Sequence, residues 1–273
     1  MVIDCHTHMV RYESFTPGYR RFLENYRPDY FGAFMGRYDN PANVDAMLEA
    51  AGVECAVVMA EPTPLTTGMA STEYVVDFCR RSRRLIPFAS FDPFLTPNLP
   101  EELERAVKEL GCRGLKLYPS YQYFAPNDAK LYPLYAKAQE LDIPVTFHTG
   151  SSVFPGARLK WADPLLLDDL ATDFPRLRVL MAHGGRPFWY DRAAFLARLH
   201  PNFYLELSGL PPRKLLTYFP ELERIADKTL FATDWPALPT DIDQNIADFS
   251  ALPLSDRAKR LILEENARRV LQL

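Results

Sequence analysis

Cysteine is scarce in this sequence, and its few copies are not arranged for metal binding. The four cysteines are Cys5, Cys55, Cys79 and Cys112, and no two of them form a C-x-x-C pair. Most lie in apolar, strand-like surroundings, where cysteine usually acts as a small buried hydrophobic residue. We therefore expect reduced thiols in a cytoplasmic protein, which argues against a disulfide scaffold and a thiolate metal site.

Long apolar runs and blocks of one charge are also missing. No segment offers the ~18 uninterrupted apolar residues that a membrane span needs, and no basic leader precedes an apolar run as in a secretory signal. Acids and bases are interspersed and the formal net charge is -4, so no basic stripe is present for nucleic acid. We expect a protein that binds neither membranes nor nucleic acid.

Short apolar runs alternate with amphipathic segments along the chain. The runs cover residues 2–6, 54–60, 85–91, 112–118, 143–148, 177–183, 202–208 and 229–234, and the amphipathic segments cover 44–52, 71–84, 98–111, 127–142, 163–174 and 255–271. This alternation is typical of a parallel sheet covered by helices. The first run lacks the glycine-rich turn of an open dinucleotide-binding sheet, since the first glycine is Gly18. We predict an α/β fold, a (β/α)8 TIM barrel, as a single domain over residues 1–273.

Residues 9–39 form an unusually long connection after the first strand. Their nine aromatic residues are Tyr12, Phe15, Tyr19, Phe22, Tyr26, Tyr30, Phe31, Phe34 and Tyr38. Long connections in compact domains are often functional lids. Two interpretations are open and compatible: a lid over the active site, and a helical excursion that packs its own aromatics. A homo-oligomer in which some of these rings contact a neighbouring subunit is a further alternative.

Most of the histidines fall where predicted strands end. His6 and His8 share one face of the first strand because side chains alternate. His148 ends the fifth run, His183 ends the sixth, and Asp234 ends the eighth. The carboxyl ends of barrel strands build the active site, and imidazole and carboxylate groups are ligands of zinc and similar ions. The pattern predicts a divalent metal site.

The motifs around these residues resemble a known superfamily. H-x-H after the first strand, "FHTG" after the fifth, "AHGG" after the sixth and "TDWP" after the eighth are similar to the amidohydrolase superfamily. More narrowly, together with "LATDFPRLRVLMAHGG" and "EENARRVL", they resemble the amidohydrolase 2 branch that contains aminocarboxymuconate semialdehyde decarboxylase-like proteins. The resemblance is weakest over 9–40 and 236–254. It does not name the substrate, because the branch contains hydrolases, decarboxylases and hydratases on one scaffold.

The resemblance implies a role for each matching residue. His6, His8, His148 and Asp234 match the ligands of a mononuclear site, which we expect to hold one Zn2+, with Mn2+ as the alternative. His183 matches a histidine that acts as acid or base, and Asp234 also exchanges a proton with the bound water. A divalent ion lowers the pKa of bound water towards ~7, so a nearby base must accept the proton.

An inward-facing lysine complicates this assignment. Leu115 and Leu117 are expected to point outward from the barrel, so Lys116 points inward, with Tyr118. Three interpretations of Lys116 are open: it binds a substrate carboxylate, it is carboxylated and bridges two metals as in binuclear members of the superfamily, or it forms a structural ion pair. Glu206 is a candidate partner of Lys116 or of a metal ligand.

Cationic residues in two loops are further candidates for substrate binding. Arg158 and Lys160 follow His148, and Arg186 follows the "HGG" motif. Cations beside a metal favour an anionic, carboxylate-bearing substrate. Each of them could equally be a solvated loop charge. His200, before the seventh strand, is expected at the opposite end of the barrel with a structural role.

The sequence therefore favours a metal-dependent hydrolase that activates water to cleave a C–O or C–N bond of a small organic acid, lactone or amide. The alternative is a nonoxidative decarboxylase or a hydratase of the same superfamily, although Lys116 disfavours simple decarboxylation. A non-catalytic metal-bound binding protein is a third hypothesis. A closed structural zinc site would not need an additional strand-end histidine such as His183.

Overall fold

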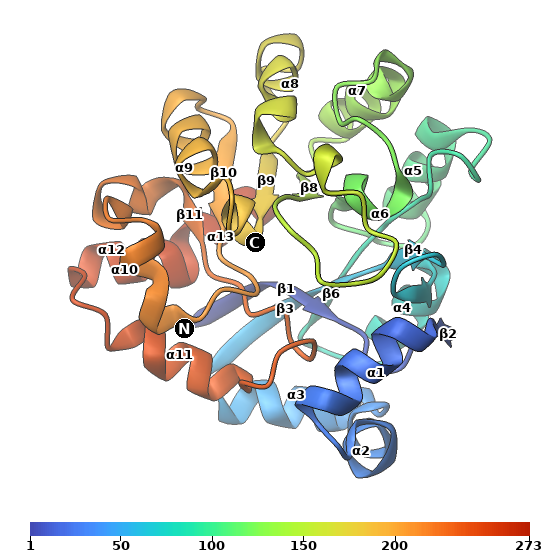
Figure 1. Ribbon diagram of the computed structural model, residues 1–273, viewed down its shortest axis with the longest axis vertical. Helices are drawn as coiled ribbons and strands as arrows, with labels where there is room; N and C mark the ends of the chain where they lie inside the picture. Colours follow the sequence, from blue (N-terminus) through green and yellow to red (C-terminus); the bar gives the residue numbers. More distant parts are fainter.

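Parallel strands stand in the centre of the molecule, and helices form a ring around them (Figure 1). The computed structural model describes residues 1–273. The barrel strands are β1 (Val2–His8), β3 (Val53–Met59), β6 (Leu85–Phe88), β7 (Leu115–Leu117), β8 (Val145–His148), β9 (Val179–Ala182), β10 (Phe203–Glu206) and β11 (Thr229–Leu230). Each predicted apolar run overlaps one of these strands, and the predicted (β/α)8 TIM barrel is confirmed.

The barrel closes through two short junctions between its sheets. One sheet has the order β1-β3-β6 and the other has the order β11-β10-β9-β8-β7. Parallel bridges Ala89–Leu115 and Thr7–Trp235 join them. At the second junction, the backbone N–H of His8 donates to the carbonyl of Trp235 over 2.7 Å. Closure brings the first and last strands together, so residues far apart in the sequence share one end of the barrel.

The helices cover the outside of this barrel. They are α1 (Pro17–Tyr26), α2 (Met35–Tyr38), α3 (Pro41–Ala50), α4 (Thr72–Cys79), α5 (Leu99–Lys108), α6 (Pro119–Gln122), α7 (Tyr132–Glu140), α8 (Asp168–Asp173), α9 (Tyr190–Leu199), α10 (Leu215–Tyr218), α11 (Ile242–Ser250), α12 (Asp256–Arg260) and α13 (Asn266–Leu271). Every predicted amphipathic segment overlaps a helix. Outside the insertion after β1, the predicted segments miss α6, α9, α10 and α11, of which α6 and α10 are only four residues long.

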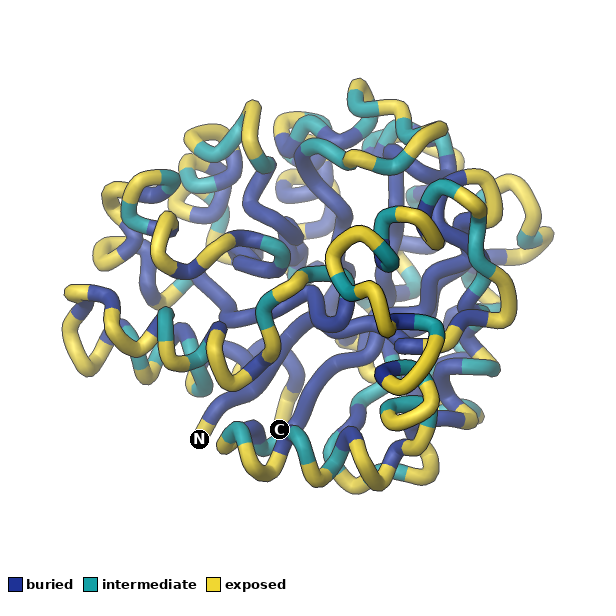
Figure 2. The backbone as a smooth tube through the Cα atoms, turned by 60° about the horizontal axis from the view of Figure 1, so that its bottom comes forward, coloured by how far each residue is buried: buried dark blue, intermediate teal, exposed yellow.

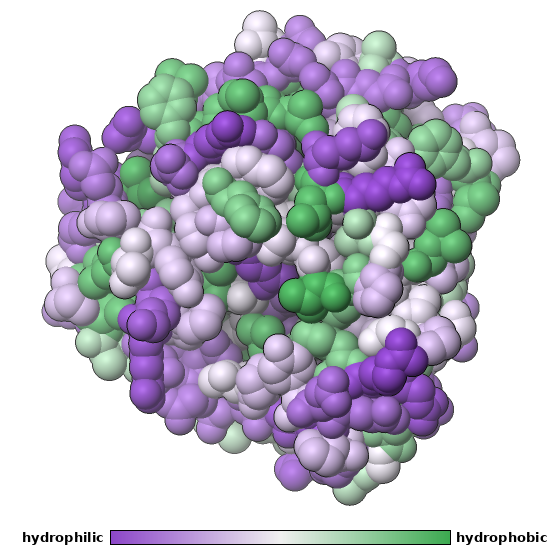
Figure 3. All heavy atoms as spheres, viewed as in Figure 1, coloured by the Kyte–Doolittle hydropathy of each residue, from purple (hydrophilic) through white to green (hydrophobic).

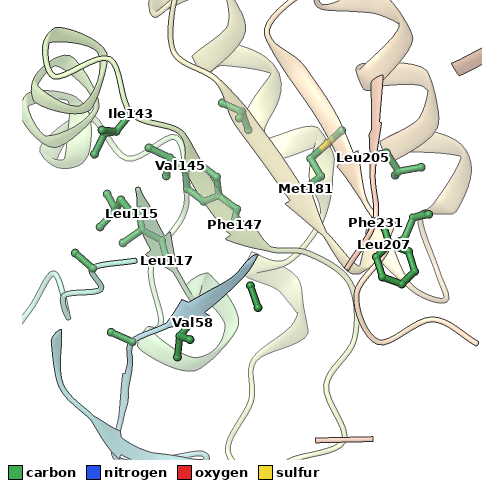
Figure 4. Close-up of a cluster of buried hydrophobic side chains, with 14 of the residues drawn as sticks. Val58, Leu115, Leu117, Ile143, Val145, Phe147, Met181, Leu205, Leu207 and Phe231 are labelled. Carbon is green, nitrogen blue, oxygen red and sulfur yellow. The ribbon is translucent and has the colours of Figure 1, made fainter. Parts of the chain in front are cut away.

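The core lies between the strands and the surrounding helices. Leu115, Leu117, Val145 and Phe147 belong to a cluster of 63 buried residues and point away from the barrel axis (Figure 4). Lys116, between the two leucines, points inward as predicted. Buried residues follow the central strands, whereas exposed residues follow the loops and the outer faces of the helices (Figure 2). Strand alternation therefore separates the outer apolar layer from the barrel interior, which contains a second cluster of 13 buried hydrophobic residues as well as polar groups.

The aromatic-rich insertion after β1 is present but contains more structure than a loop. It holds β2 (Ser14–Phe15), α1, a π-helical turn over Tyr30–Phe34 and α2. Strand β2 pairs with β5 (Gly68–Ala70), which pairs with β4 (Glu61–Thr63), in a small antiparallel sheet. These strands are too short to show the alternation by which a strand is recognised in a sequence. The sheet ties the insertion to the segment that follows β3.

All four cysteines are free and buried. None of the helices combines the length and the apolar character that crossing a bilayer would require.

Candidate active site

The predicted ligands meet at the carboxyl end of the barrel. His6 and His8 lie on β1, His148 is the last residue of β8, His183 follows β9, and Asp234 lies just beyond β11. All five side chains line one cavity of about 160 Å³. Figure 3 shows a hollow at the centre of this face, with hydrophilic atoms inside it and hydrophobic residues beside it. The structure thus brings together residues that span most of the chain.

Three donor atoms converge as they would around one ion. The Nε2 atoms of His6 and His8 are 3.2 Å apart, and Asp234 Oδ1 lies 3.7 Å from the first and 3.3 Å from the second. Donors at ~2.1 Å from a tetrahedral ion lie roughly 3.4 Å apart. The donor set and its spacing therefore fit a divalent metal.

Carboxylates hold the other nitrogen of both histidines. Glu206 Oε2 lies 3.0 Å from His6 Nδ1, and Glu61 Oε2 lies 3.1 Å from His8 Nδ1. A carboxylate accepts a hydrogen bond, so each Nδ1 carries a proton. At His6 this leaves the Nε2 lone pair directed towards the metal position, whereas at His8 a bound ion would replace the proton on Nε2. Such partners fix ring orientation and make the imidazole a better ligand.

His148 and His183 form a pair beside this cluster. His183 Nδ1 lies 3.0 Å from the carbonyl oxygen of Ser208, which only accepts, so Nδ1 carries the proton. His183 Nε2 then accepts from His148 Nδ1 over 3.1 Å. His148 Nε2 is left buried without a partner. An orphaned buried acceptor at this place fits the predicted ligand role of His148.

The distances between donor atoms by themselves would also allow His183 as a metal ligand. The donor atoms of His6, His183 and Asp234 lie within 4.8 Å of one another. Hydrogen bonds to Ser208 and His148 occupy both nitrogens of His183, which leaves no lone pair for an ion. His183 therefore lies beside the cluster, and its role as a base or acid stays a prediction.

Two residues at the carboxyl end of the barrel, His183 and Asp234, have strained backbone conformations. His183 has φ 63° and Asp234 has φ 68°, in the left-handed region that non-glycine residues rarely adopt. Such conformations cost about 1–3 kcal/mol each and persist where the surroundings impose them, often at functional sites. The bend at Asp234 is held by its backbone N–H, which donates to the carbonyl of His6 over 2.9 Å.

Asp234 and His8 are held in charged states. Burial would favour a protonated Asp234, but the neighbouring histidines, His183 first, outweigh it and hold the pKa of Asp234 well below its usual range. Burial would favour a neutral His8, but the carboxylates of Glu61 and Asp234 raise its pKa to about 9. Asp234 is therefore an anion facing the cavity at neutral pH.

The other histidines are neutral. Burial lowers the pKa of His6, His148 and His183 well below that of a free histidine. The positive charge of Lys116 adds to this effect at His6, and that of Arg186 adds to it at His183. Neutral imidazoles can accept a metal or a proton, as the predicted roles require.

The interior lysine and glutamate lie on opposite sides of His6. Lys116 Nζ lies 3.4 Å from His6 Nε2 and 4.9 Å from the centre of the Tyr118 ring. Glu206 accepts hydrogen bonds from Ser208 Oγ and from the Ser208 backbone, both over 2.9 Å. Burial lowers the pKa of Lys116 and raises that of Glu206, and the opposite charge of the partner offsets part of each shift. Glu206 is therefore a hydrogen-bond partner of His6, and its charge favours the charged form of Lys116 without a direct ion pair.

Arg186 and Tyr118 reach the cavity as predicted. The guanidinium of Arg186 donates to the carbonyl of Gly209 over 2.8 Å and lies 3.9 Å from Asp234 Oδ2. The hydroxyl of Tyr118 donates to the carbonyl of Ala60 over 2.9 Å, so its ring forms part of the wall. Arg186 is the cation best placed to meet an anionic ligand in the cavity.

The other two predicted cations do not reach the cavity. The guanidinium of Arg158 lies over the ring of Tyr123, 4.3 Å from its centre. Lys160 Nζ lies 4.4 Å from the centre of the Trp161 ring. Both residues lie in the loop after His148, as the sequence indicated. Their cation–π contacts, however, hold them on the side of this loop that faces away from the cavity.

Aromatic rings from the insertion cover the cavity. Tyr19, Phe22 and Tyr26 of α1 are among its lining residues. Phe154, from the loop after β8, contacts the rings of Tyr19 and Phe22 edge-on at centroid distances of 5.0 and 4.9 Å. The insertion therefore acts as a lid, and it also packs its own aromatics.

The sequence interpretation missed Glu61 and correctly set His200 apart. Glu61 directly follows the second apolar run, at the barrel end where the ligands lie, so its position carried a usable signal. His200 Nε2 lies 2.7 Å from Asp168 Oδ1, outside the cavity, in agreement with a structural role.

Comparisons with known proteins agree with this geometry. The family model described as Amidohydrolase matches residues 3–273. The 2-keto-4-carboxy-3-hexenedioate hydratase of Sphingobium sp. is 30% identical over 202 residues, which span 62% of this chain and 59% of the hydratase. The gamma-resorcylate decarboxylase of Rhizobium sp. is 26% identical over 243 residues, which span 71% of this chain and 72% of the decarboxylase.

Solved structures show the same barrel. A TIM-barrel protein of Bordetella bronchiseptica, Bb4693, has a TM-score of 0.80 at 24% identity and covers 99% of this chain and 98% of its own. The 5-carboxyvanillate decarboxylase of Novosphingobium aromaticivorans, complexed with manganese, has a TM-score of 0.69 at 16% identity over 100% of this chain and 96% of its own. With the family match over nearly all residues, these findings show that the chain belongs to the amidohydrolase family, whose members among its relatives are enzymes.

Proposed function

We propose that this protein is a metal-dependent enzyme that activates water against a small, flat substrate bearing a carboxylate. Addition of water to the substrate, as in a hydratase, is the first reaction to test, and hydrolysis is the second. The relative with 30% identity acts as a hydratase, although the match spans only about three fifths of that protein.

One observation carries the proposal: an anionic carboxylate faces the cavity beside neutral imidazole. Asp234 Oδ2 lies 3.9 Å from Nδ1 of His183, whose pKa burial holds well below that of a free histidine. Such a carboxylate can accept a proton from water while a histidine close to it supplies or relays one. A site that only bound metal would not need both groups next to open space.

The chain's own residues then divide the work. His6, His8, His148 and Asp234 would hold one divalent ion, which when bound polarises oxygen and lowers the pKa of water. Asp234 would accept the water proton, and His183, whose Nδ1 lies 3.9 Å from Asp234 Oδ2, would pass that proton on to the substrate once its hydrogen bond to Ser208 or His148 opens. Arg186 holds a substrate carboxylate, and the rings of the lid exclude bulk water.

A zinc ion is our expectation for the metal, and manganese is the alternative. Imidazole and carboxylate donors suit both ions. Metal analysis of the purified protein, followed by reconstitution of the chelated protein with each ion, decides between them. The proposed site takes one equivalent, and a second equivalent would instead favour a carboxylated Lys116.

Nonoxidative decarboxylation is the second candidate function. A specific observation favours it: the aromatic walls and the guanidinium of Arg186 suit an aromatic acid, and the gamma-resorcylate decarboxylase is 26% identical over 71% of this chain. Against it stands Lys116, whose ammonium group lies beside His6 on the floor of the cavity.

Product mass separates the two functions. The metal-loaded protein is incubated with unsaturated keto-dicarboxylates, lactones, cyclic amides and dihydroxybenzoates, with Asp234→Asn as the matched control. We expect a wild-type-dependent gain of one water, with no carbon dioxide released. Release of carbon dioxide without uptake of water would instead establish the decarboxylase. The buried free thiols fit the cytoplasmic location expected from the sequence, which stays a prediction.

A further inference from the structure

Glu61 is the one buried carboxylate that contacts both the candidate metal ligands and the lid. It begins β4, outside the barrel proper, and only 3% of its surface is exposed. No motif of the sequence includes it. Its contacts therefore suggest a function that the ligand pattern by itself does not contain.

One side of Glu61 faces the metal position. Oε2 lies 3.1 Å from His8 Nδ1, so the carboxylate accepts the proton of that nitrogen and orients Nε2 towards the ion, which would replace the Nε2 proton on binding. The same oxygen accepts a hydrogen bond from the Tyr12 hydroxyl over 2.6 Å. His8 could otherwise rotate, because it lies at the last position of β1.

The other side of Glu61 faces the base of the lid. Oε1 accepts from Thr67 Oγ1 over 2.7 Å. The carbonyl of Thr67 accepts from the backbone N–H of Thr16 over 2.9 Å, and Thr16 Oγ1 caps α1 at the N–H of Tyr19 over 3.2 Å. A continuous set of hydrogen bonds thus runs from His8 to the start of the lid helix.

Tyr12 makes the same connection through its ring. It stacks on Phe15 at a centroid distance of 5.0 Å and contacts Tyr19 at 5.8 Å. Tyr19 lines the cavity. Removal of the Glu61 carboxylate would therefore disturb His8 and α1 together.

We propose that Glu61 is a positioning residue, which holds His8 for the metal and anchors the lid helix α1 over the same cavity. The inference rests on the proposed metal-dependent function. It adds that metal retention and closure of the lid depend on one side chain. Partners of metal-bound histidines typically change metal affinity by ~10–100-fold when they are replaced.

The test uses two readouts on the whole chain. Affinity for Zn2+, or for Mn2+ if the wild type retains that ion, is measured by competition with a chromogenic chelator. Hydrogen exchange of Pro17–Tyr26 reports the anchoring of α1. We expect Glu61→Gln to weaken metal binding by ~10–100-fold and to accelerate exchange in α1. Glu109→Gln, which removes an exposed carboxylate, should change neither readout.

Two further variants keep the inference falsifiable if Glu61→Gln unfolds. Tyr12→Phe and Thr67→Val each remove one donor to Glu61 and leave its carboxylate in place. Both should accelerate exchange in α1 while metal affinity changes by less than about threefold, since the contact with His8 is the one that affinity depends on.

Wild-type metal affinity in a folded Glu61→Gln would overturn the positioning of His8, and unchanged α1 exchange would overturn the anchoring of the lid. A wild-type protein that binds neither ion would instead contradict the proposed function. The exchange of the metal-free variants would then still test the anchor.

Discussion

The two histidines of one motif lie in two differently built halves of the site. His6 belongs to the barrel half, where Glu206 of β10 holds it and burial beside Lys116 lowers its pKa. His8 belongs to the half next to the small antiparallel sheet, where Glu61 of β4 contributes to a His8 pKa of about 9. Neighbouring positions on one strand thus have opposite protonation preferences. The protonation of each histidine therefore depends on which strand supplies the carboxylate at its Nδ1. The H-x-H motif does not specify that strand.

The largest expected effect concerns the barrel half. His183→Asn should leave folding and metal content nearly intact but lower kcat by ~10²–10⁴-fold, the range for a positioned acid or base. Steady-state kinetics with metal analysis of the same samples checks this. If the metal is lost as well, His183 is a ligand and not an acid or base beside the metal.

Removing each carboxylate compares the halves directly. Glu206→Gln should destabilise the metal-free protein by about 3 kcal/mol, because it leaves the buried Lys116 without its main compensating charge. Glu61→Gln should cost only about 1–2 kcal/mol, since Asp234 still faces the charged His8 and the other donors to Glu61 are neutral hydroxyl groups. Urea denaturation of both variants measures the difference. Equal losses of unfolding free energy in the two variants would mean that Glu206 compensates a buried charge no more than Glu61 does.

The neutrality of the barrel half predicts a dependence of stability on pH. The pKa of His183 is lowered by burial in the folded protein, so below pH ~6.5 the unfolded chain binds one proton more at this residue. Stability from His183 is therefore present above that pH and is lost at about 1.4 kcal/mol per pH unit as the pH falls. Relative to His183→Asn, the metal-free wild type should lose this amount between about pH 6 and pH 5. Parallel denaturation profiles for the two proteins would contradict a neutral His183.

The smallest effect is expected at the lid. Phe154→Ala removes edge-on contacts with Tyr19 and Phe22, and aromatic contacts of this kind are worth about 0.5–1.5 kcal/mol. We expect KM to rise by up to about tenfold, with little change in kcat. Phe188→Ala, an exposed ring outside the cavity, is the control. A kcat that falls as steeply as in His183→Asn would show that the lid takes part in the chemistry.

Much of the barrel half was predictable because its signals are local. A buried strand must be apolar, and its last residue must face the active end, so His148 could be placed from the sequence. The inward direction of Lys116 followed from strand alternation. Arg158 could not be placed, because its contact with Tyr123 depends on how two loops meet.

The sequence by itself determined the barrel, its order of strands and the strand-end positions of His6, His8, His183 and Asp234, because the periodicity of apolar residues and the alternation of side chains are properties of a single segment. Only the tertiary structure decided which groups hold these residues. Glu61 reaches His8 from a short sheet that no pattern predicted, and Glu206 reaches His6 across the barrel interior. Burial and charge at such contacts depend on segments far apart in the chain, so protonation states could not be predicted before the chain was folded.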